Sequence, residues 1–302
     1  MRICSLLPSA TEIVGALGLA DSLVAVSEEC DWPPEVRALP VITASRIDTT
    51  RLSGLEIDRA VRDAVQDGRA LYAVDKEILE AVEPDLILTQ NLCTVCAVSA
   101  ANVDELCATD AEIVAVDAHT IAEIKQGILS LADLLGVPSR GRAIVAEMNA
   151  KIESIRDRVA GAEPRRAFVA EWLAPPFAAG HWIPEMVELA GGVEVLGMAG
   201  APSHPTSWAT VRTLRPDLVV VAPCGFDHVR AACEARLPAA LRCRAVAVDS
   251  NAYYARPAPR ISDGIAQLAF LIHPDLVADP GLPYVELTLD GDQLGSSCAP
   301  LS

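Results

Sequence analysis

Short apolar runs alternate with longer amphipathic stretches along this chain. Residues 3–7 predict a strand that leads into a helix beginning near Pro8, with Ser9 as its N-cap and Glu12 as the capping-box partner. Three further apolar runs in this half of the chain predict strands, over residues 23–26, 85–89 and 113–116. The last two lack polar alternation, as expected where both faces of a sheet are covered. This order of elements predicts a mostly parallel α/β sheet.

The second half of the chain repeats the plan of the first. A helical pattern runs from residue 120 to about residue 159, with a kink or cap at residues 136–138. The alternation of strand and helix then resumes over residues 167–171, 184–190, 218–221, 245–248 and 261–272. Residues 77–88 and 210–221 both follow the order helix, Pro-Asp, buried strand, so the two halves are interpreted as copies of one plan.

These patterns predict two α/β lobes, over residues 1–119 and 163–277. A connecting helix or helix pair over residues 120–162 joins them, and residues 278–302 form a tail of uncertain structure. The carboxyl ends of the strands are expected to face each other across a cleft, which is where ligands bind in such folds.

Composition narrows the classes of partner. The chain has 302 residues and a net charge of −17, with no cluster of Lys or Arg, so a nucleic acid or an anionic membrane surface would be repelled. No apolar run reaches the length of a membrane span, so we expect no membrane insertion. The nine cysteines show no framework spacing, which favours a reducing compartment. The N-terminus has no signal-peptide core, which predicts a cytoplasmic protein, or a periplasmic or cell-surface one if an export signal precedes Met1.

All four tryptophans fall in predicted loops beside prolines or turn residues: Trp32, Trp172, Trp182 and Trp208. One interpretation is that each fills a gap within its own lobe. The other is that they line a cleft and stack on a large flat ligand.

Several segments together resemble the cobalamin-binding members of the class III periplasmic substrate-binding proteins, which take iron complexes and vitamin B12. They are residues 2–12 with 30–34, 84–90, 174–192 and 254–260. The resemblance implies two Rossmann-like lobes bridged by a rigid helix. It also implies a monomeric binding protein, not an enzyme, that presents a metal chelate to an ABC permease. No intrinsic cofactor is implied, because cobalamin or a related chelate is the ligand.

The resemblance further implies a set of ligand-binding residues whose rings pack on the corrin edge and whose polar groups bond its amides. They are Pro8, Ser9, Thr11, Asp31, Trp32, Gln90, Asn91, Trp172, Phe177, His181, Trp182, Trp208, Tyr253 and Arg256. The acidic balance favours a corrinoid over an anionic iron chelate, although an iron chelate stays open. For docking on a permease, Glu77 stands at the matching place in the first lobe, whereas Ala209 and Thr210 occupy the positions where the second lobe would carry Glu.

The alternative hypothesis is a cytosolic metal-binding or redox protein that uses the pair Cys93 and Cys96. A single CxxC supplies two of the four ligands that zinc normally takes, and two plain reduced thiols also fit the pattern. No phosphate-binding loop, nucleophile elbow or His-Glu-x-x-His motif points to an enzyme.

Overall fold

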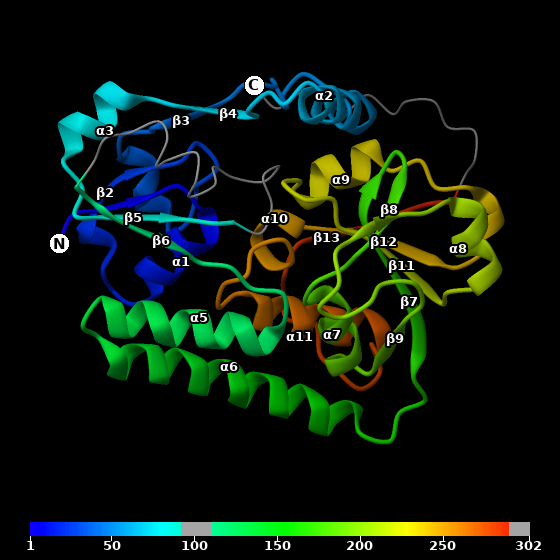
Figure 1. Cartoon of the computed structure of the whole chain (residues 1–302). Helices are drawn as coiled ribbons and strands as arrows, with labels where there is room; N and C mark the ends of the chain where they lie inside the picture. The colour runs from blue at the N-terminus through cyan, green and yellow to red at the C-terminus, as the bar shows by residue number, and fades with distance from the viewer. Residues whose placement is uncertain (92–109, 290–302) are drawn as a thin grey trace. The chain divides into compact units, whose positions relative to one another are not determined.

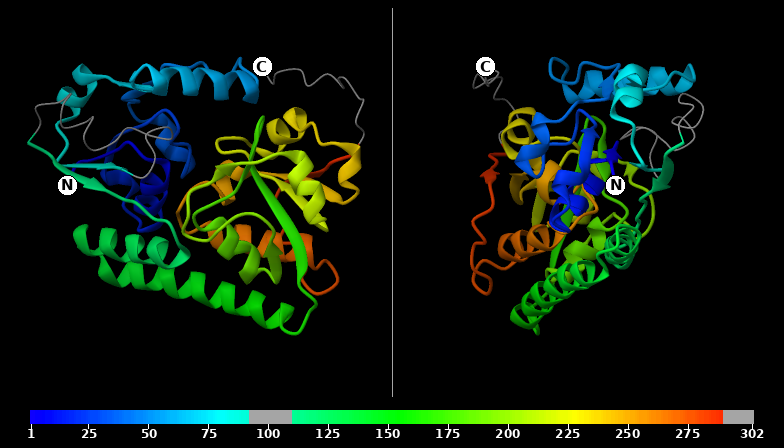
Figure 2. Two further views of the ribbon diagram at one scale, coloured as in Figure 1. Left: turned by 45° about the vertical axis from the view of Figure 1, so that its right-hand side comes forward. Right: turned by 90° about the vertical axis from the view of Figure 1, so that its left-hand side faces the viewer.

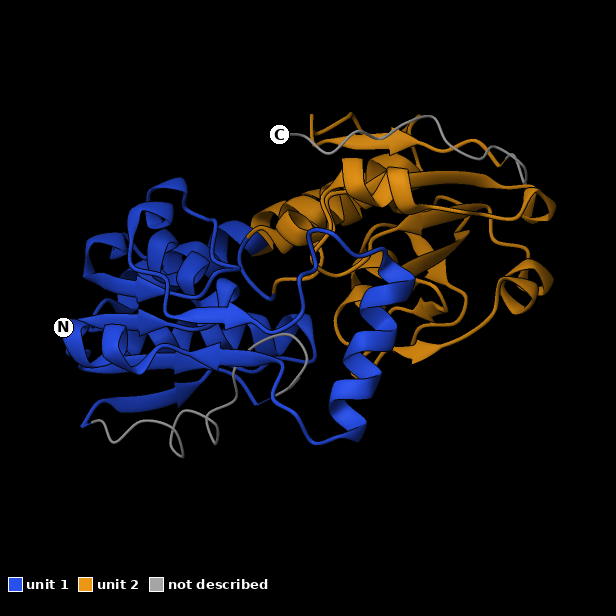
Figure 3. Cartoon of the chain, turned by 90° about the horizontal axis from the view of Figure 1, so that it is seen from above, with its two compact units in different colours: residues 1–148, 257–259 blue, residues 149–256, 260–302 orange. Residues whose placement is uncertain are grey.

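The computed structural model describes residues 1–91 and 110–289. The chain divides into two compact units (Figure 3): unit 1 comprises residues 1–148 and 257–259, and unit 2 comprises residues 149–256 and 260–302. The division falls inside helix α6 (Pro138–Val159), whereas the sequence pattern puts the first lobe's end at residue 119 and the connection at 120–162.

Unit 1 is built on a four-stranded parallel sheet in the order β2-β1-β5-β6 (Figure 1). Its strands are β1 (Ile3–Ser5), β2 (Leu23–Val26), β5 (Leu86–Thr89) and β6 (Glu112–Ala115). A separate antiparallel pair consists of β3 (Thr43–Ser45) and β4 (Tyr72–Val74). The helices of unit 1 are α1 (Pro8–Ala16), α2 (Gly54–Gln66), α3 (Lys76–Val82), α5 (Ile121–Leu134) and the first part of α6.

Helices cover both faces of this sheet. Leu79 and Val82 of α3 pack on one face in a cluster with Cys4, Leu6 and Ile87, while α1 and α5 lie on the other (Figure 1). The predicted break between two helices is confirmed, because α5 ends at residue 134 and α6 begins at residue 138. Of the two predicted alternatives for this connection, one helix or a helix pair, the structure has the helix pair.

Unit 2 holds a larger mixed sheet in the order β10-β8-β7-β11-β12-β13, with β9 also paired to β7. Its strands are β7 (Arg165–Leu173), β8 (Pro176–Ala178), β9 (Gly192–Glu194), β10 (His204–Pro205), β11 (Leu218–Val221), β12 (Arg244–Val248) and β13 (Tyr284–Glu286). Strands β9, β7, β11 and β12 run parallel. The helices are α7 (Ile183–Leu189), α8 (Trp208–Leu214), α9 (His228–Glu234), α10 (Ser250–Tyr253) and α11 (Ile261–Ile272).

Helices α7 and α11 lie together on one face of the unit 2 sheet, and α9 lies on the other (Figures 1 and 2). The approach is close at Gly192, where a Cβ atom would lie 2.9 Å from Ile272 Cδ1 of α11 and 3.0 Å from Val187 Cγ1 of α7. Strand β11 lies between β7 and β12 in the sheet and is buried along its whole length, so it belongs to the core of this unit.

The two units repeat one hydrogen-bonded arrangement at the amino ends of their strands. In unit 1 the backbone N–H of Arg2 donates to the Asp85 carboxylate at 2.6 Å, and Arg2 Nε donates to the Val82 carbonyl at 2.9 Å. In unit 2 the same two bonds, at 2.8 and 3.0 Å, join Arg166 to Asp217 and Leu214. The predicted repeat is thus present in three dimensions as well as in sequence.

The start of α1 differs from its prediction. Its N-cap is Leu7, which makes no side-chain cap bond, and Pro8 is the first helical residue. Proline favours this first position because its fixed φ suits the helix and its missing N–H would have no partner there. Ser9 consequently lies inside the helix, and the prediction that it is the N-cap is wrong.

Strand β13 was not predicted, because residues 278–302 carry several glycines and prolines. It pairs antiparallel with β12, and Arg244 forms an ion pair with Glu286 across the two strands. The Gln267 amide N–H group donates to the carbonyls of Leu282 and Pro283, which holds the approach to the strand. Among the described residues, none of the helices combines the length and apolar character needed to cross a bilayer.

Candidate functional site

In unit 1, a buried polar cluster forms where β1 meets α1. The Thr11 hydroxyl donates to Ser5 Oγ at 2.8 Å and lies 3.0 Å from the Cys30 thiol, which in turn lies 3.1 Å from the Ser27 hydroxyl. Thr11 is therefore engaged within its own unit. Ser9 Oγ is also buried and makes no hydrogen bond in the structure.

The loop after β2 presents a tryptophan. Trp32 is 42% exposed, and the next residue, Pro33, packs on α1 at Gly15. A Cβ at Gly15 would lie 2.6 Å from Pro33 Cδ, so only glycine leaves room for this contact. Asp31 pairs with Arg37 at 3.8 Å. The contact of Pro33 with Gly15 thus holds the loop that carries Asp31 and Trp32 against α1.

Two polar residues follow β5 at the carboxyl edge of the same sheet. Gln90 is buried and Asn91 is exposed. The backbone N–H of Asn91 donates to the Asp117 carboxylate at 2.8 Å, and Asp117 follows the neighbouring strand β6. Because the carboxyl ends of parallel strands share one edge, these groups and the start of α1 belong to one surface of unit 1.

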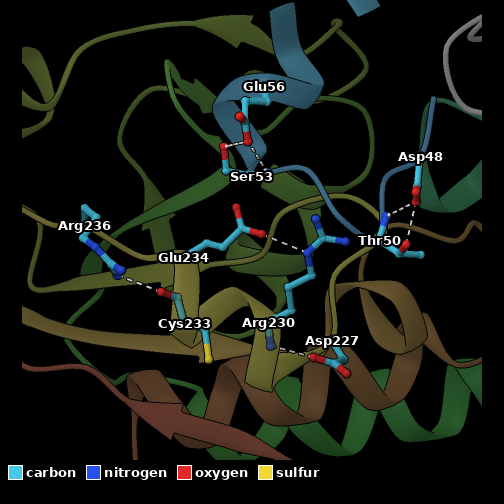
Figure 4. Close-up of polar contacts among 9 residues, drawn as sticks. All are labelled: Asp48, Thr50, Ser53, Glu56, Asp227, Arg230, Cys233, Glu234 and Arg236. Carbon is cyan, nitrogen blue, oxygen red and sulfur yellow. Dashed lines mark hydrogen bonds and ion pairs between the residues drawn. The ribbon is translucent and has the colours of Figure 1, made fainter. Parts of the chain in front are cut away.

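In unit 2, an aromatic group forms at the carboxyl ends of β7 and β11. Trp172 and Phe226 meet edge to face, with ring centroids 5.4 Å apart. The Arg230 guanidinium carbon lies 3.9 Å from the centroid of the Phe226 ring, and Arg230 Nε donates to Glu234 at 2.9 Å. Asp227 caps α9 by accepting the backbone N–H of Arg230 at 2.7 Å (Figure 4).

The segment after β7 holds three more of the predicted residues. Phe177 lies on β8, and His181 has a positive φ of 51° and donates its backbone N–H to the Ala201 carbonyl. Trp182 is only 6% exposed, and its indole N–H donates to the Tyr254 carbonyl at 2.7 Å. The Trp182 ring is therefore part of the core of unit 2, and its one polar atom is used internally.

The remaining predicted residues of unit 2 lie at two separate places. Trp208 begins α8 and packs edge to face on Phe168, a core residue of β7, with centroids 6.0 Å apart. Arg256 is buried and donates to Asn251 Oδ1 at 3.0 Å, while Tyr253 lies beneath the Arg260 guanidinium at 5.6 Å. Tyr253 and Arg256 thus follow β12, whose neighbour β11 ends close to Trp172.

Phe226, His228 and Asp249 belong to this carboxyl edge and were missed from the sequence. Asp249 follows β12 and caps α10 by accepting the Ala252 N–H at 2.9 Å. Burial raises the pKa of Asp249 above its ordinary value, and nearby Asp227 raises it further. Only Asp249 carried a signal in the sequence: it is an Asp directly after a buried strand, and such residues cap the following helix at the ligand-binding edge.

Two open cavities lie elsewhere. One of about 650 Å³ in unit 1 lies between α2 and the segments around Arg46 and Arg69, and one of about 540 Å³ in unit 2 is lined by residues that include Arg165, Asp217 and His273. Neither is lined by a predicted ligand-binding residue.

A family model described as periplasmic binding protein matches residues 3–242. The chain belongs to the periplasmic binding protein family. A vitamin B12-binding protein of Vibrio cholerae serotype O1 (strain ATCC 39541) is 26% identical over 275 residues, which cover 88% of this chain and 87% of that protein. A vitamin B12-binding protein of Yersinia pestis (strain Pestoides F) is 27% identical over 227 residues, which cover 73% and 69%.

Solved structures of this family have the same fold. The periplasmic vitamin B12-binding protein of Vibrio cholerae matches with a TM-score of 0.64 at 24% identity, over 90% of this chain and 96% of that one. A periplasmic heme-binding protein of Pseudomonas aeruginosa matches with a TM-score of 0.71 at 18% identity, over 95% and 98%. These matches confirm the predicted α/β fold and the predicted family. The proteins in these four matches are named for what they bind, and none for a reaction.

The docking residue predicted from the family resemblance is exposed. Glu77 lies in the first turn of α3, and Ala209 and Thr210 lie exposed in the first turn of α8, the matching helix of unit 2. The two helices have the same length, and each ends at a residue with a positive φ, Glu83 or Arg215. The two helices therefore share a backbone conformation and differ in charge, because α3 carries Glu77 in its first turn and α8 carries no acidic residue there.

The alternative based on cysteine chemistry is not tested by the geometry. Cys93 and Cys96 lie outside the described residues. Within residues 1–91 and 110–289, no three His, Cys, Asp or Glu side chains converge as a metal site. In this part of the chain Cys4, Cys30, Cys224 and Cys243 form no disulfide, whereas Cys233 is disulfide-bonded, which departs from the reducing compartment that the cysteine spacing favours.

Proposed function

We propose that this protein is a solute-binding protein whose ligand is a corrinoid such as cobalamin, or a metal chelate of similar size. The observation that carries the proposal is the match to vitamin B12-binding proteins over most of the length of both chains. Heme-binding relatives share the fold, so heme is the competing chelate.

The chemistry of the predicted residues supports this choice. A corrinoid offers a large apolar ring edge and a rim of carboxamides, which suit aromatic faces and neutral polar groups. Among the predicted ligand residues of unit 1 are the exposed ring of Trp32 and the amides of Gln90 and Asn91. Those of unit 2 include Trp172, whose ring meets Phe226 edge to face, together with Phe177 and Tyr253. Thr11 and Trp182 are assigned supporting roles, because their polar atoms bond within their own units.

We also propose that the captured ligand is handed to an ABC permease, with Glu77 as a docking residue. The exposure of Glu77 supports this role. Because Ala209 and Thr210 are uncharged, only unit 1 would present a carboxylate to the permease at these matching positions.

Titration of the purified protein with cobalamin tests the binding proposal. We expect saturable one-to-one binding by calorimetry and by visible absorbance, with hemin and a ferric siderophore titrated in parallel. Trp32→Ala should weaken cobalamin binding about tenfold, because an aromatic contact and its buried area are lost. Leu55→Ala is the matched control, since Leu55 of α2 is equally exposed in the same unit and is not a predicted ligand residue. Absence of saturable cobalamin binding would contradict the proposal, and tighter binding of hemin would redirect it to heme.

A further inference from the structure

Two ring nitrogens in unit 2 are buried without a hydrogen-bond partner: Trp172 Nε1 and His228 Nδ1. Buried polar atoms in folded proteins are nearly always paired, because an unpaired one loses its bonds to water and gains nothing in return. Two such atoms in one region of a unit therefore require an explanation.

Both side chains belong to the carboxyl edge of neighbouring parallel strands. Trp172 lies at the end of β7, and its ring contacts Phe226, which precedes His228 by two residues on the loop after β11. The Cys224 N–H donates to the Glu171 carbonyl at 3.2 Å, and the Asn251 N–H donates to the Phe226 carbonyl at 3.1 Å. These bonds tie the loop after β11 to strand β7 on one side and to helix α10, which follows β12, on the other. The two nitrogens thus lie on a fixed part of the fold.

Neighbouring groups are already engaged with other partners. The Asp227 carboxylate accepts the backbone N–H of Arg230, and the Arg230 side chain pairs with Glu234 (Figure 4). Asp249 lies near enough to His228 to interact with it electrostatically, yet its carboxylate accepts the Ala252 N–H. The fold therefore orients the charges around His228 without supplying a partner for Nδ1.

We infer that Trp172 Nε1 and His228 Nδ1 are hydrogen-bonding groups reserved for carboxamides at the rim of the ligand. An indole N–H only donates, so its partner must carry an acceptor oxygen. An imidazole nitrogen donates or accepts according to the tautomer, and a primary carboxamide offers both an oxygen and an N–H. A carboxylate, the rim group of heme, offers only acceptors. A carboxylate can pair with the indole N–H but with His228 Nδ1 only in the tautomer that carries its proton there, whereas a carboxamide can pair with either tautomer, so the two nitrogens favour a corrinoid over heme.

This inference rests on the proposed function, and the variants separate the two. Cyanocobalamin and hemin are the probes. His228→Leu removes both ring nitrogens, His228→Asn keeps a polar atom near the position of Nδ1, and Trp172→Phe keeps an aromatic ring without the N–H. We expect His228→Leu and Trp172→Phe to weaken cyanocobalamin binding about tenfold and His228→Asn less than about threefold. Hemin binding should change less than cyanocobalamin binding in all three variants.

Stability gives a second readout that a merely structural role would not produce. His228→Leu removes an unpaired buried nitrogen, so the unliganded variant should melt at the same temperature as wild type or higher. His273→Leu is the matched control, because His273 is buried in the same unit and its Nε2 is bonded to the Gly191 carbonyl at 2.9 Å. It should lower the melting temperature and leave cyanocobalamin affinity unchanged below the transition.

The outcomes are distinct. Wild-type binding of cyanocobalamin with unchanged affinity in His228→Leu and Trp172→Phe would overturn the inference and leave the proposed function standing. A loss of affinity in His228→Leu matched by a lower melting temperature would also overturn it, since the residue would then be structural. Binding of hemin alone by the wild type would overturn the carboxamide assignment, and binding of neither probe would overturn the proposed function together with the inference.

Discussion

Glu194 is the residue at which burial and hydrogen bonding oppose each other most directly. Its carboxylate accepts three backbone N–H groups, from Val169 at 3.1 Å, Leu196 at 3.2 Å and Gly197 at 3.3 Å. These bonds favour the charged form, but burial outweighs them and raises the pKa of Glu194 from 4.5 to about 7. The residue thus joins β9, β7 and the following loop through a carboxyl group that titrates near neutral pH.

A pH-dependent stability follows. Because the pKa of Glu194 is higher in the folded than in the unfolded chain, the folded state binds the proton more tightly. The stabilisation that protonated Glu194 provides is fully present below pH 4.5 and is lost as the pH rises through about 7. The free energy of unfolding should fall by up to about 3 kcal/mol over this range. Urea denaturation of wild type and Glu194→Gln at several pH values should show their difference in unfolding free energy shrinking or reversing between pH 5 and 8. Glu188→Gln, an exposed change on α7, is the control, and a pH-independent difference for Glu194→Gln would contradict the prediction.

The exposure and hydrogen bonding of single residues were the hardest features to predict from the sequence. The sequence indicated that tryptophans cluster in loops, but it did not distinguish the exposed Trp32 from the buried Trp182, because that difference depends on long-range contacts with residues such as Tyr254. His228 carried no local signal at all. Its unpaired nitrogen is a property of the folded neighbourhood, in which Asp227 and Asp249 are oriented by backbone groups.

At the level of elements, α3 and α8 show how the repeat is encoded. Asp75 caps α3 by accepting the Ile78 N–H, and Ser207 caps α8 by accepting the Thr210 N–H at 3.0 Å. Different residue types perform the same task at matching places, since both can accept from the third residue of the helix.

Removing either cap should therefore cost a similar free energy. Asp75→Ala and Ser207→Ala are each expected to lower the free energy of unfolding by about 1 kcal/mol. Denaturant melts of the two variants check this, with Lys76→Ala as a control because Lys76 is exposed and caps nothing among the described residues. A cost confined to one variant would show that the two helices do not contribute equally to their units.

Elements with strong patterns were predicted well, and the others had specific reasons to be missed. Strands β2 and β11 and helix α11 have the predicted bounds, because continuous apolar runs and a clear helical period mark them. Helix α2 was missed, although Ser53 and Glu56 form a capping box in which the Ser53 hydroxyl lowers the pKa of Glu56 (Figure 4). Strand β13 is short and is defined by its pairing with β12, which no local pattern reveals.

At the level of the whole molecule, the net charge of −17 acts on any charged ligand. An acidic protein attracts a cation from beyond contact distance, and salt screens that attraction over about 10 Å at 0.1 M. The two common forms of cobalamin differ in charge, since aquocobalamin is a cation and cyanocobalamin is neutral.

We expect salt to weaken binding of aquocobalamin and to leave binding of cyanocobalamin unchanged. Between about 0.05 M and about 0.5 M NaCl, the affinity for aquocobalamin should fall about threefold. Parallel calorimetric titrations at constant pH measure both, so each form serves as the reference for the other. Equal salt dependence for the two forms would contradict this prediction, because it would show that the net charge of the protein does not affect the affinity for a cationic ligand.

The contact between Gly15 and Pro33 also constrains how this protein can change in evolution. The two positions are 18 residues apart in the chain, yet the proline ring occupies the space that any side chain at position 15 would need. A mutation at either position alone is thus penalised: a side chain at 15 displaces the loop that carries Trp32, and loss of Pro33 leaves the glycine without its contact. Among homologues, the two positions should therefore vary together, and a relative with a larger residue at position 15 should have a different residue at position 33 and a different loop in front of it.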